Sequence, residues 1–316
     1  MTILTLTPNP SVDRTIAIAE LHRGEVHRAT SSRIDPGGKG INVSRALTAQ
    51  STPTVAVFPS GGPEGRLMEA LLDTAGVPRY TVPVEGTLRM NVAVVEPDGT
   101  TTKLNEPGPT LTGDDVDALI DGTLAAVDAT TTWVVGCGSL PPGAPVDLYA
   151  TLVRRAREHG VRVAIDSSEA PLAAAVAARP QLIKPNHEEL AELVGTPMTT
   201  LRDVRDAAAA LVADGIERVV VSLGGDGALL VDATGCTHAI ATIDDPLSTV
   251  GAGDCLLAGL LDALSRDQDA ATALIAGVTW GAAAVRLPGS RVPSSADCED
   301  IVVICTADPD LDRLLH

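Results

Sequence analysis

Segments with the pattern of helices and of strands alternate regularly from residue 114 onward. Strands that are joined through helices pair in parallel, and helices then cover both faces of the sheet. The alternation therefore predicts an α/β fold with a mostly parallel sheet. In chain order the expected elements are helix 114–126, strand 133–136, helix 147–159, strand 161–165, helix 170–177, strand 182–184, helices 187–194 and 202–213, strands 219–223, 228–231 and 238–243, and helices 253–264 and 269–284.

The N-terminal part of the chain is richer in strands. Residues 3–7 and 54–58 have the composition of core strands, whereas residues 15–34 form short alternating segments with no helix between them. Residues 91–95 and 100–105 flank a Pro-Asp-Gly turn and indicate a β-hairpin. We expect this hairpin and residues 15–34 to form a small antiparallel sheet apart from the main one.

Net charge and cysteine content argue against several classes of function. The formal net charge of −18 argues against binding to nucleic acid or an anionic membrane, and no apolar run is long enough to span a membrane. The five cysteines are scattered and include no Cys-x-x-Cys pair, which argues against disulfides or a zinc site and for a reducing compartment. We expect a cytoplasmic protein.

The stretch Ser248–Asp254 carries a strong chemical signal. Gly251, Ala252 and Gly253 precede an apolar run that suits a buried helix, so main-chain N–H groups at this helix start can face an anion. Asp254 lies in the same turn. Its carboxylate can cap the helix, or it can take a proton from a hydroxyl while the N–H groups hold a transferring group. This stretch by itself leaves both interpretations open.

Polar or glycine-rich stretches follow several expected strands. In a parallel sheet the carboxyl ends of the strands meet at one edge, where open α/β folds bind ligands. We therefore expect these stretches to gather there. They are residues 8–13, 61–65, 136–143, 184–189 and 224–227.

Lysine is rare in this chain. Only 3 of the 23 basic residues are lysines, and Lys39, Lys103 and Lys184 each lie beside Gly, Pro or Asn residues. We interpret this placement as a requirement for a point charge on a flexible stem, with chance as the alternative. The glycine turn at 37–40, which contains Lys39, matches neither a Walker A loop nor a dinucleotide-binding fingerprint.

Four motifs in order resemble those of the ribokinase-like, or PfkB-type, carbohydrate kinases, along nearly the whole chain. Residues 37–42 resemble the first signature of that family, and residues 248–259 resemble its second and more specific one. Residues 184–189 match its Asn-x-x-Glu segment, and residues 222–227 match its nucleotide-side loop. One glycine loop would be weak support, whereas four motifs in the same order are specific.

Other segments resemble the phosphosugar branch of that family. The resemblance implies a single kinase domain over residues 1–316, with a three-layer αβα, Rossmann-like architecture and a small β-sheet lid. The lid strands would be inserted at about 14–35 and 87–107, in agreement with the two strand-rich segments. The segments that resemble this branch are residues 7–13, 89–91, 105–109 and 138–143.

The resemblance also implies roles for individual residues. Asp254 would be the general base on the acceptor hydroxyl, and Gly251, Ala252 and Gly253 would form the anion hole for the transferring phosphoryl group. The residues implied for the phosphosugar are Asp13, Gly38, Lys39 and Asn42 on its hydroxyls, and Arg89 with Ser139 or Lys103 on its phosphate. The residues implied for the nucleotide are Lys184, Asn186, Ser222, Gly224, Gly227, Ser248 and Gly281.

Several of these residues have a simpler interpretation. Arg89 could form a surface salt bridge, Lys103 could solubilise an exposed strand edge, and Glu189 could belong to a solvated helix face. In the family, Glu189 would instead act on Mg²⁺ through water. Cys255 is expected to be a small buried residue, because phosphoryl transfer needs no covalent step. A monovalent cation such as K⁺ is also common in the family, and the matching carbonyls are those of Ser248, Val250, Ala284, Leu287, Gly289 and Arg291.

The resemblance implies an ATP-dependent phosphosugar kinase, with D-fructose 1-phosphate as the first expected acceptor and fructose 1,6-bisphosphate as the product. A tagatose-6-phosphate kinase or a 6-phosphofructokinase of the same family is the alternative. A non-catalytic sugar-phosphate sensor is a remote one, disfavoured by the intact Asp254 and glycine turn. The expected partners are the phosphosugar and ATP, with no nucleic acid or membrane, and exposed lid edges favour a homodimer through the lid.

Overall fold

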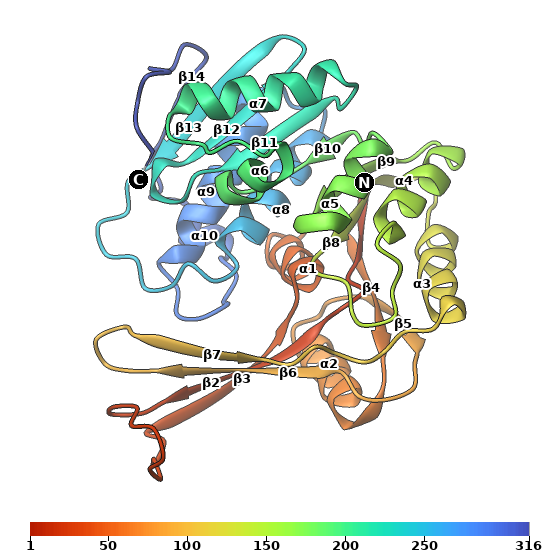
Figure 1. Cartoon of the computed structure of the whole chain (residues 1–316), viewed down its shortest axis with the longest axis vertical. Coiled ribbons are helices and arrows are strands. Elements are labelled where there is room, and N and C mark those ends of the chain that lie inside the picture. Colours follow the sequence, from red (N-terminus) through yellow and green to blue (C-terminus); the bar gives the residue numbers. More distant parts are fainter. Residues whose placement is uncertain (316) are drawn as a thin grey trace.

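The computed structural model describes residues 1–315 and contains two β-sheets of different size (Figure 1). The larger sheet has ten strands. From one edge to the other they are β14 (Val303–Thr306), β13 (Gly235–Ala241), β12 (Ala228–Asp232), β11 (Arg218–Ser222), β10 (Leu182–Ile183), β9 (Arg162–Asp166), β8 (Thr131–Cys137), β1 (Thr2–Leu6), β4 (Thr54–Ser60) and β5 (Arg79–Pro83).

The strands from β5 to β11 in the larger sheet are all parallel to their neighbours. The remaining strands, β12, β13 and β14, pair antiparallel. A parallel crossover needs a dozen or more residues, and only the short turn around Gly224–Asp226 joins β11 to β12, so this pair must be a hairpin. The predicted α/β fold with a mostly parallel sheet is confirmed.

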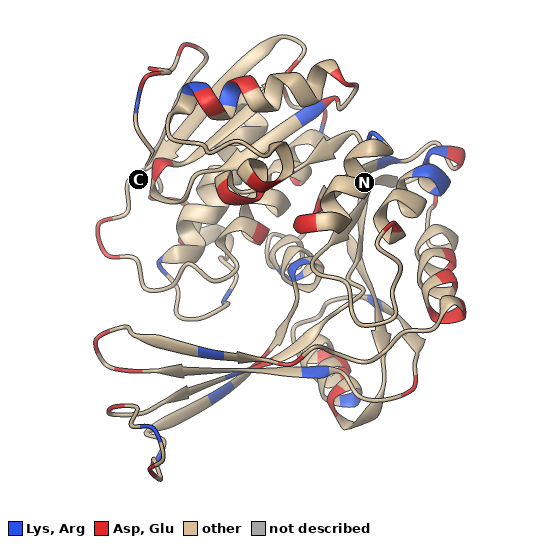
Figure 2. Ribbon diagram, in the orientation of Figure 1, with Lys and Arg blue, Asp and Glu red and all other residues tan. Residues whose placement is uncertain are grey.

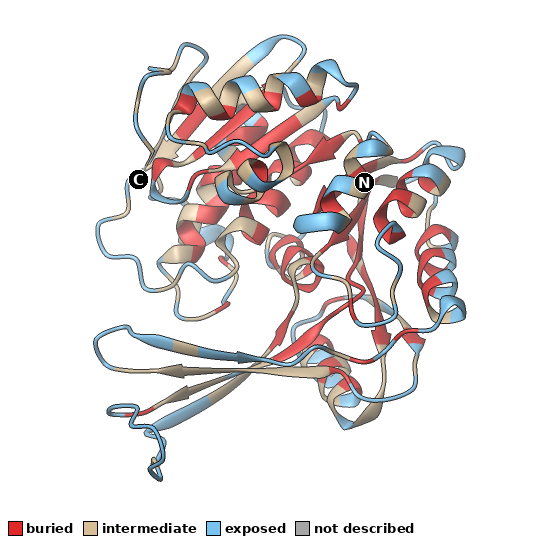
Figure 3. Cartoon of the chain, in the orientation of Figure 1, coloured by how far each residue is buried: buried red, intermediate tan, exposed pale blue. Residues whose placement is uncertain are grey.

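Helices cover both faces of the larger sheet. The helices of residues 1–315 are α1 (Lys39–Ala49), α2 (Gly62–Thr74), α3 (Gly113–Ala125), α4 (Leu148–Glu158), α5 (Glu169–Ala177), α6 (His187–Val194), α7 (Leu201–Ala213), α8 (Ala252–Ser265), α9 (Ala270–Val285) and the short α10 (Ser295–Cys298), which packs on α9. The central strands are buried on both sides (Figure 3). In β8, Val134 packs into the core formed with α3 to α7, whereas Trp133 and Val135 pack into the core formed with α1, α8 and α9. Alternate residues of a strand point to opposite faces, which explains this division.

The smaller sheet lies apart from the larger one, at the bottom of Figure 1. Its strands, in spatial order, are β3 (Ser31–Gly37), β2 (Ser11–Ala17), β6 (Arg89–Val95) and β7 (Thr101–Asn105). The predicted small sheet apart from the main one is confirmed; β3–β2 and β6–β7 pair antiparallel as expected, whereas β2 and β6 are parallel. These two strands belong to separate excursions from the larger sheet, whereas β2–β3 and β6–β7 are each a local antiparallel pair.

Three elements were not predicted from the sequence: the edge strands β5 and β14 and the short helix α10. Edge strands are covered on fewer sides, so their sequences show weaker apolar patterning. In β14 the side chain of Ile304 is 68% exposed. Its pairing with β13 joins segments about 60 residues apart, which no local pattern reveals.

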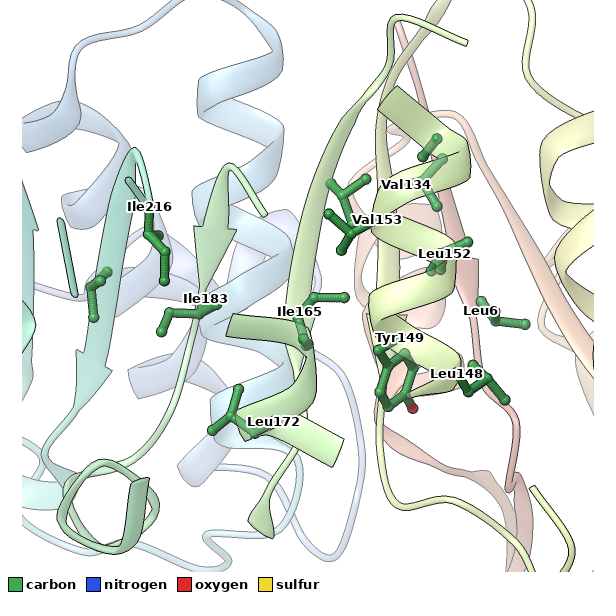
Figure 4. Packing of buried hydrophobic residues seen from close by; sticks show 14 of the residues in the cluster. Leu6, Val134, Leu148, Tyr149, Leu152, Val153, Ile165, Leu172, Ile183 and Ile216 are labelled. Carbon is green, nitrogen blue, oxygen red and sulfur yellow. The ribbon is translucent and has the colours of Figure 1, made fainter. Parts of the chain in front are cut away.

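We predict a measurable role for Tyr149, which connects the core to the end of β8. Its side chain is buried beside Leu148 and Ile165 (Figure 4), and its hydroxyl donates a hydrogen bond to the Gly138 carbonyl at 2.8 Å. Losing this bond in Tyr149→Phe should lower the free energy of unfolding by about 1 kcal/mol in urea titrations. The control Tyr80→Phe, at an exposed position, should change it by less than about 0.5 kcal/mol. Equal effects for the two variants would contradict the prediction.

Candidate active site

Several predicted site residues, together with Asp166, which was not predicted, cluster beyond the carboxyl ends of the parallel strands. Asp166 is the last residue of β9, Lys184 follows β10, and Gly224 follows β11. The start of α8, with Gly251 and Asp254, lies against the same edge, because Gly253 is adjacent to the Lys184 ammonium group. This is the edge where open α/β sheets bind ligands.

Negative charge is spread over the outer helices (Figure 2). Helix α3, for example, carries four aspartates and no basic residue: Asp114, Asp115, Asp117 and Asp121. Any anionic ligand therefore depends on positive charge that is concentrated locally. Within residues 1–315, no helix is long and apolar enough to cross a membrane.

Asp254 does not cap helix α8. The N-cap residue is Gly251, whose φ of 80° suits glycine, and Asp254 lies in the first helical turn without a capping hydrogen bond. The capping interpretation is therefore wrong. Instead, one carboxylate oxygen, Oδ2, accepts a hydrogen bond from Asn42 Nδ2 at 2.8 Å, and the side chain is only 7% exposed.

The environment of Asp254 raises its pKa to about 6. Burial is the main cause, and the nearby Asp166 carboxylate adds to it, while the hydrogen bond from Asn42 and the charges of Lys39 and Lys184 oppose the increase. A carboxylate with a pKa near 6 is ionised at neutral pH and accepts a proton more readily than an exposed aspartate. The group thus has the properties of a general base.

Asp166 is the centre of a buried ionic cluster. Its carboxylate is fully buried and contacts Lys39 Nζ at 2.7 Å and Lys184 Nζ at 3.0 Å. Burial alone would raise the pKa of Asp166, but Lys184 and Lys39 hold it below its usual value. Although burial opposes the charge on Lys39, Asp166 and Glu189 raise the pKa of this lysine. Asp166 was not among the predicted site residues, although it directly follows the expected strand 161–165. A polar residue directly after a core strand was the available signal.

Glu189 and Asn186 form a reciprocal capping box at the start of α6. Asn186 Oδ1 accepts from the Glu189 N–H at 2.7 Å, and Glu189 Oε2 accepts from the Asn186 N–H at 2.9 Å. Glu189 Oε1 also lies 3.5 Å from Lys39 Nζ, and the Glu189 side chain is only 17% exposed. The alternative of a solvated helix face is therefore wrong.

A second polar cluster surrounds Asp13 on β2. Its Oδ1 accepts hydrogen bonds from Ser11 Oγ at 2.7 Å and Asn91 Nδ2 at 3.1 Å, and burial raises its pKa. Arg89 donates from Nη2 to the Asn9 carbonyl at 2.9 Å, while its buried Nε has no hydrogen-bond partner among residues 1–315. In that part of the chain Arg89 forms no ion pair, so the salt-bridge alternative is wrong.

The other residues predicted for the phosphosugar lie at different distances from this cluster. Asn9 Nδ2 donates to Ser139 Oγ at 3.4 Å, so Ser139 lies next to Asn9, whose carbonyl accepts the hydrogen bond from Arg89. Gly38 is the N-cap of α1 and has a φ of 109°. Lys39 joins the Asp166 cluster, and the exposed Lys103 on β7 lies opposite Ala93 on β6. Within the described chain no hydrogen bond or ion pair links Lys103 to either cluster.

A pocket of about 450 Å³ lies beside the start of α8. Its walls are mostly small or aliphatic, and Leu256, Val278 and Val285 contribute from α8 and α9. Of the residues predicted for the nucleotide, Ser222, Gly224, Gly227 and Gly281 line this pocket, as do Ala252 and Gly253 of the predicted anion hole. Lys184 is adjacent to Gly253, and Asn186 pairs with Ser222 across a β-bridge.

The residues predicted for a monovalent cation come from two segments that lie side by side. The Ser248 N–H donates to the Val285 carbonyl at 3.2 Å, which holds the loop before α8 against the end of α9. The first segment carries Ser248 and Val250, and the second carries Ala284, Leu287, Gly289 and Arg291. The Ala284 carbonyl accepts a hydrogen bond from the Leu287 N–H at 3.0 Å.

Cys255 follows Asp254 in α8 and is fully buried. Burial is the main cause that raises the pKa of its thiol, and the Asp254 carboxylate adds to it. A buried thiol with a raised pKa is not a nucleophile at neutral pH. The expectation of a structural role for Cys255 agrees with this environment.

Comparison with known proteins identifies relatives along most of the chain. Residues 7–297 match the family model described as pfkB family carbohydrate kinase. A 1-phosphofructokinase of Rhodobacter capsulatus is 37% identical over 85% of this chain and 85% of its own length. The ATP-dependent 6-phosphofructokinase isozyme 2 of Escherichia coli is 35% identical over 95% of this chain and 97% of its own. A crystal structure of phosphofructokinase-2 from Escherichia coli in complex with potassium has a TM-score of 0.89 at 34% identity, covering 95% of this chain and 97% of that one.

The raised pKa of Asp254 predicts a pH-dependent cost to stability. Between about pH 4 and pH 6 the folded protein binds this proton more tightly than the unfolded chain, so stability falls as pH rises through that interval. Asp254→Asn removes the titration. We predict that the difference in free energy of unfolding between Asp254→Asn and wild type changes by about 1–3 kcal/mol in favour of the variant from pH 4 to pH 7, as measured in urea titrations. A difference that stays flat between pH 4 and pH 7 would contradict the prediction.

Proposed function

The chain belongs to the PfkB family of carbohydrate kinases and is an ATP-dependent phosphosugar kinase; we propose that it converts D-fructose 1-phosphate to fructose 1,6-bisphosphate. The observation that carries this proposal is the position of Asp254. It adjoins Gly253, which lines the pocket beside α8. It is also hydrogen-bonded to Asn42, one helical turn from the Gly38 N-cap of α1.

In the proposed mechanism Asp254 takes the proton from the acceptor hydroxyl as the phosphoryl group transfers in line. Its pKa near 6 supports this role, because the carboxylate is ionised at neutral pH yet basic enough to accept the proton. The main-chain N–H groups of Gly251, Ala252 and Gly253, at the positive end of the α8 dipole, would stabilise charge on the transferring group. Lys184, adjacent to Gly253, would add a fixed positive charge there.

The Asp13 cluster is the proposed binding site for the phosphosugar. Asp13, Gly38 and Asn42 would bind hydroxyl groups of the sugar. Lys39 would also bind a sugar hydroxyl, at the boundary with the Asp166 cluster. Arg89 would bind the existing phosphate, with Ser139 or Lys103 as a further contact. The unpartnered Nε of Arg89 supports this role, because a guanidinium group can bind a phosphate through two parallel hydrogen bonds.

The nucleotide would occupy the pocket beside α8, with Lys184, Asn186, Ser222, Gly224, Gly227, Ser248 and Gly281 around it. Mg²⁺ is usually held by one or two carboxylates together with substrate phosphates and water. The residues fit that pattern, because the Glu189 carboxylate keeps 17% of its side chain exposed beside Lys39, next to the Asp166 cluster. Glu189 stands at the rim of the Asp166 cluster and would hold Mg²⁺ through water, and the ion would neutralise phosphate charge.

We also propose a monovalent cation, K⁺, at the carbonyls of Ser248, Val250, Ala284, Leu287, Gly289 and Arg291. The hydrogen bond between the two segments supports the site, as does the potassium complex of phosphofructokinase-2 from Escherichia coli. Carbonyl oxygens are hard ligands that suit such a cation.

The arrangement of the chain is proposed to be one kinase domain over residues 1–316, in which the smaller sheet acts as a lid over the acceptor. Its strands lie within the segments 14–35 and 87–107 or at their borders. Closing the lid would exclude water from the phosphoryl group. We further propose a cytoplasmic homodimer through the lid. A solved structure of phosphofructokinase-2 from Escherichia coli is of its tetrameric inhibited form.

A panel of acceptors tests the proposed substrate. In a coupled assay of ADP release, kcat/KM should be highest for fructose 1-phosphate, by at least about tenfold over fructose 6-phosphate and tagatose 6-phosphate. Unphosphorylated fructose should be a poorer substrate still, because Arg89 would then lack its partner. Preference for fructose 6-phosphate or tagatose 6-phosphate would favour the alternative activities instead. Best turnover on an unphosphorylated sugar would contradict the binding role of Arg89.

A further inference from the structure

Arg45 on α1 has a guanidinium group that donates hydrogen bonds to neutral oxygens. Its Nη1 donates to the Pro36 carbonyl at 3.0 Å, to Asn42 Oδ1 at 3.0 Å and to the Ser290 carbonyl at 3.1 Å. Within residues 1–315, no carboxylate forms an ion pair with Arg45. It therefore joins the end of β3, helix α1 and the loop after α9 at one point, next to the proposed base.

The contact with Asn42 fixes the orientation of that side chain. A guanidinium can only donate hydrogen bonds, so the amide oxygen of Asn42 must face Arg45. The amide nitrogen then faces the opposite way, where it donates to Asp254 Oδ2 at 2.8 Å. If Arg45 were absent, Asn42 could rotate and place its oxygen against the carboxylate of Asp254, or its nitrogen elsewhere.

We propose that Arg45 is a positioning residue that acts on Asp254 through Asn42. By holding the amide in one orientation, it ensures that the carboxylate of Asp254 faces a hydrogen-bond donor and not an acceptor. The inference rests on the proposed function in one respect, namely that Asp254 is the general base. Arg45 itself does not contact the acceptor or the nucleotide in this scheme.

The charged groups around Arg45 and Asp254 influence the pKa of Asp254, through which the effect of Arg45 can be measured. Arg45 faces Asp35, Asp13 and Arg33 of the smaller sheet and Cys255 of α8, and although burial lowers its pKa the guanidinium stays protonated. The groups that face Asp254 are Asp166, Lys39 and Lys184. The hydrogen bond from Asn42 is one of the contacts that lower the pKa of Asp254, so losing it should raise that pKa.

The test is the pH dependence of kcat/KM for fructose 1-phosphate, which reports the pKa of the base in the free enzyme. In Arg45→Met the acidic limb should move up by about one pH unit, so that activity falls about tenfold near pH 5.5 and stays within about threefold of wild type at pH 8.5. Gln50→Leu is the matched control. Gln50 also lies next to α1 and donates to the same loop, at the Pro293 carbonyl, but does not contact Asn42. Its acidic limb should not move.

A double-mutant cycle separates the route through Asn42 from a direct effect of charge. Asn42→Ala should move the acidic limb by a similar amount, and adding Arg45→Met to it should cause no further shift. Thermal unfolding of each variant checks that the protein is folded. If Arg45→Met does not fold, Arg45→Lys serves in its place and should give a smaller shift in the same direction, because an ammonium group cannot reach all three oxygens.

Each remaining outcome overturns one of three conclusions: the positioning role of Arg45, the route through Asn42, or the assignment of Asp254 as base. A loss of activity that is uniform with pH, or a shift that Gln50→Leu reproduces, overturns the positioning role and leaves a structural one. A shift that persists in the Asn42→Ala background overturns the route through Asn42. A wild-type profile with no acidic limb between about pH 5 and pH 7 overturns the assignment of Asp254 as base, and with it the proposed mechanism.

Discussion

The ion pairs of Asp166 with two lysines are the interaction on which the rest of the site depends. Asp166 is fully buried at the end of β9, and it fixes Lys39 from α1 and Lys184 from the segment after β10. Removing one partner of a buried ion pair typically costs about 3–5 kcal/mol, because the remaining charge is left uncompensated. In a chain with a net charge of −18, this carboxylate is what keeps two ammonium groups next to the start of α8.

The same carboxylate explains the chemistry of its neighbour. Two lysines lower the pKa of Asp166, and burial, together with the resulting negative charge of Asp166, raises the pKa of Asp254 to about 6. Environments that separate the pKa values of two nearby acids commonly give them different roles. In the proposed mechanism Asp166 remains a fixed counter-charge, whereas Asp254, positioned by Asn42 and Arg45, would exchange a proton with the acceptor. In that mechanism the position of each aspartate in the fold, and not its residue type, decides which of the two has a structural role and which exchanges a proton.

Local patterns were sufficient to predict the α/β class, most helices, the core strands and the gathering of glycine turns at one edge of the sheet. They could not reveal the parallel pairing of β2 with β6 or the addition of β14, because those contacts join segments distant in sequence. The same limit applies to the site. The Asn-x-x-Glu match placed Asn186 and Glu189 in one motif, but it did not show that they cap α6 reciprocally. Nor could the sequence show that Asp166 pairs with lysines from two other elements.

The most direct measurement of the role of Asp254 is the turnover of Asp254→Asn with saturating fructose 1-phosphate and ATP. The amide keeps the size of the side chain and can still accept the hydrogen bond from Asn42, but it cannot take a proton. If Asp254 is the general base, kcat should fall by on the order of 10³ or more while KM for ATP changes little. A decrease in kcat of less than about tenfold would contradict this role.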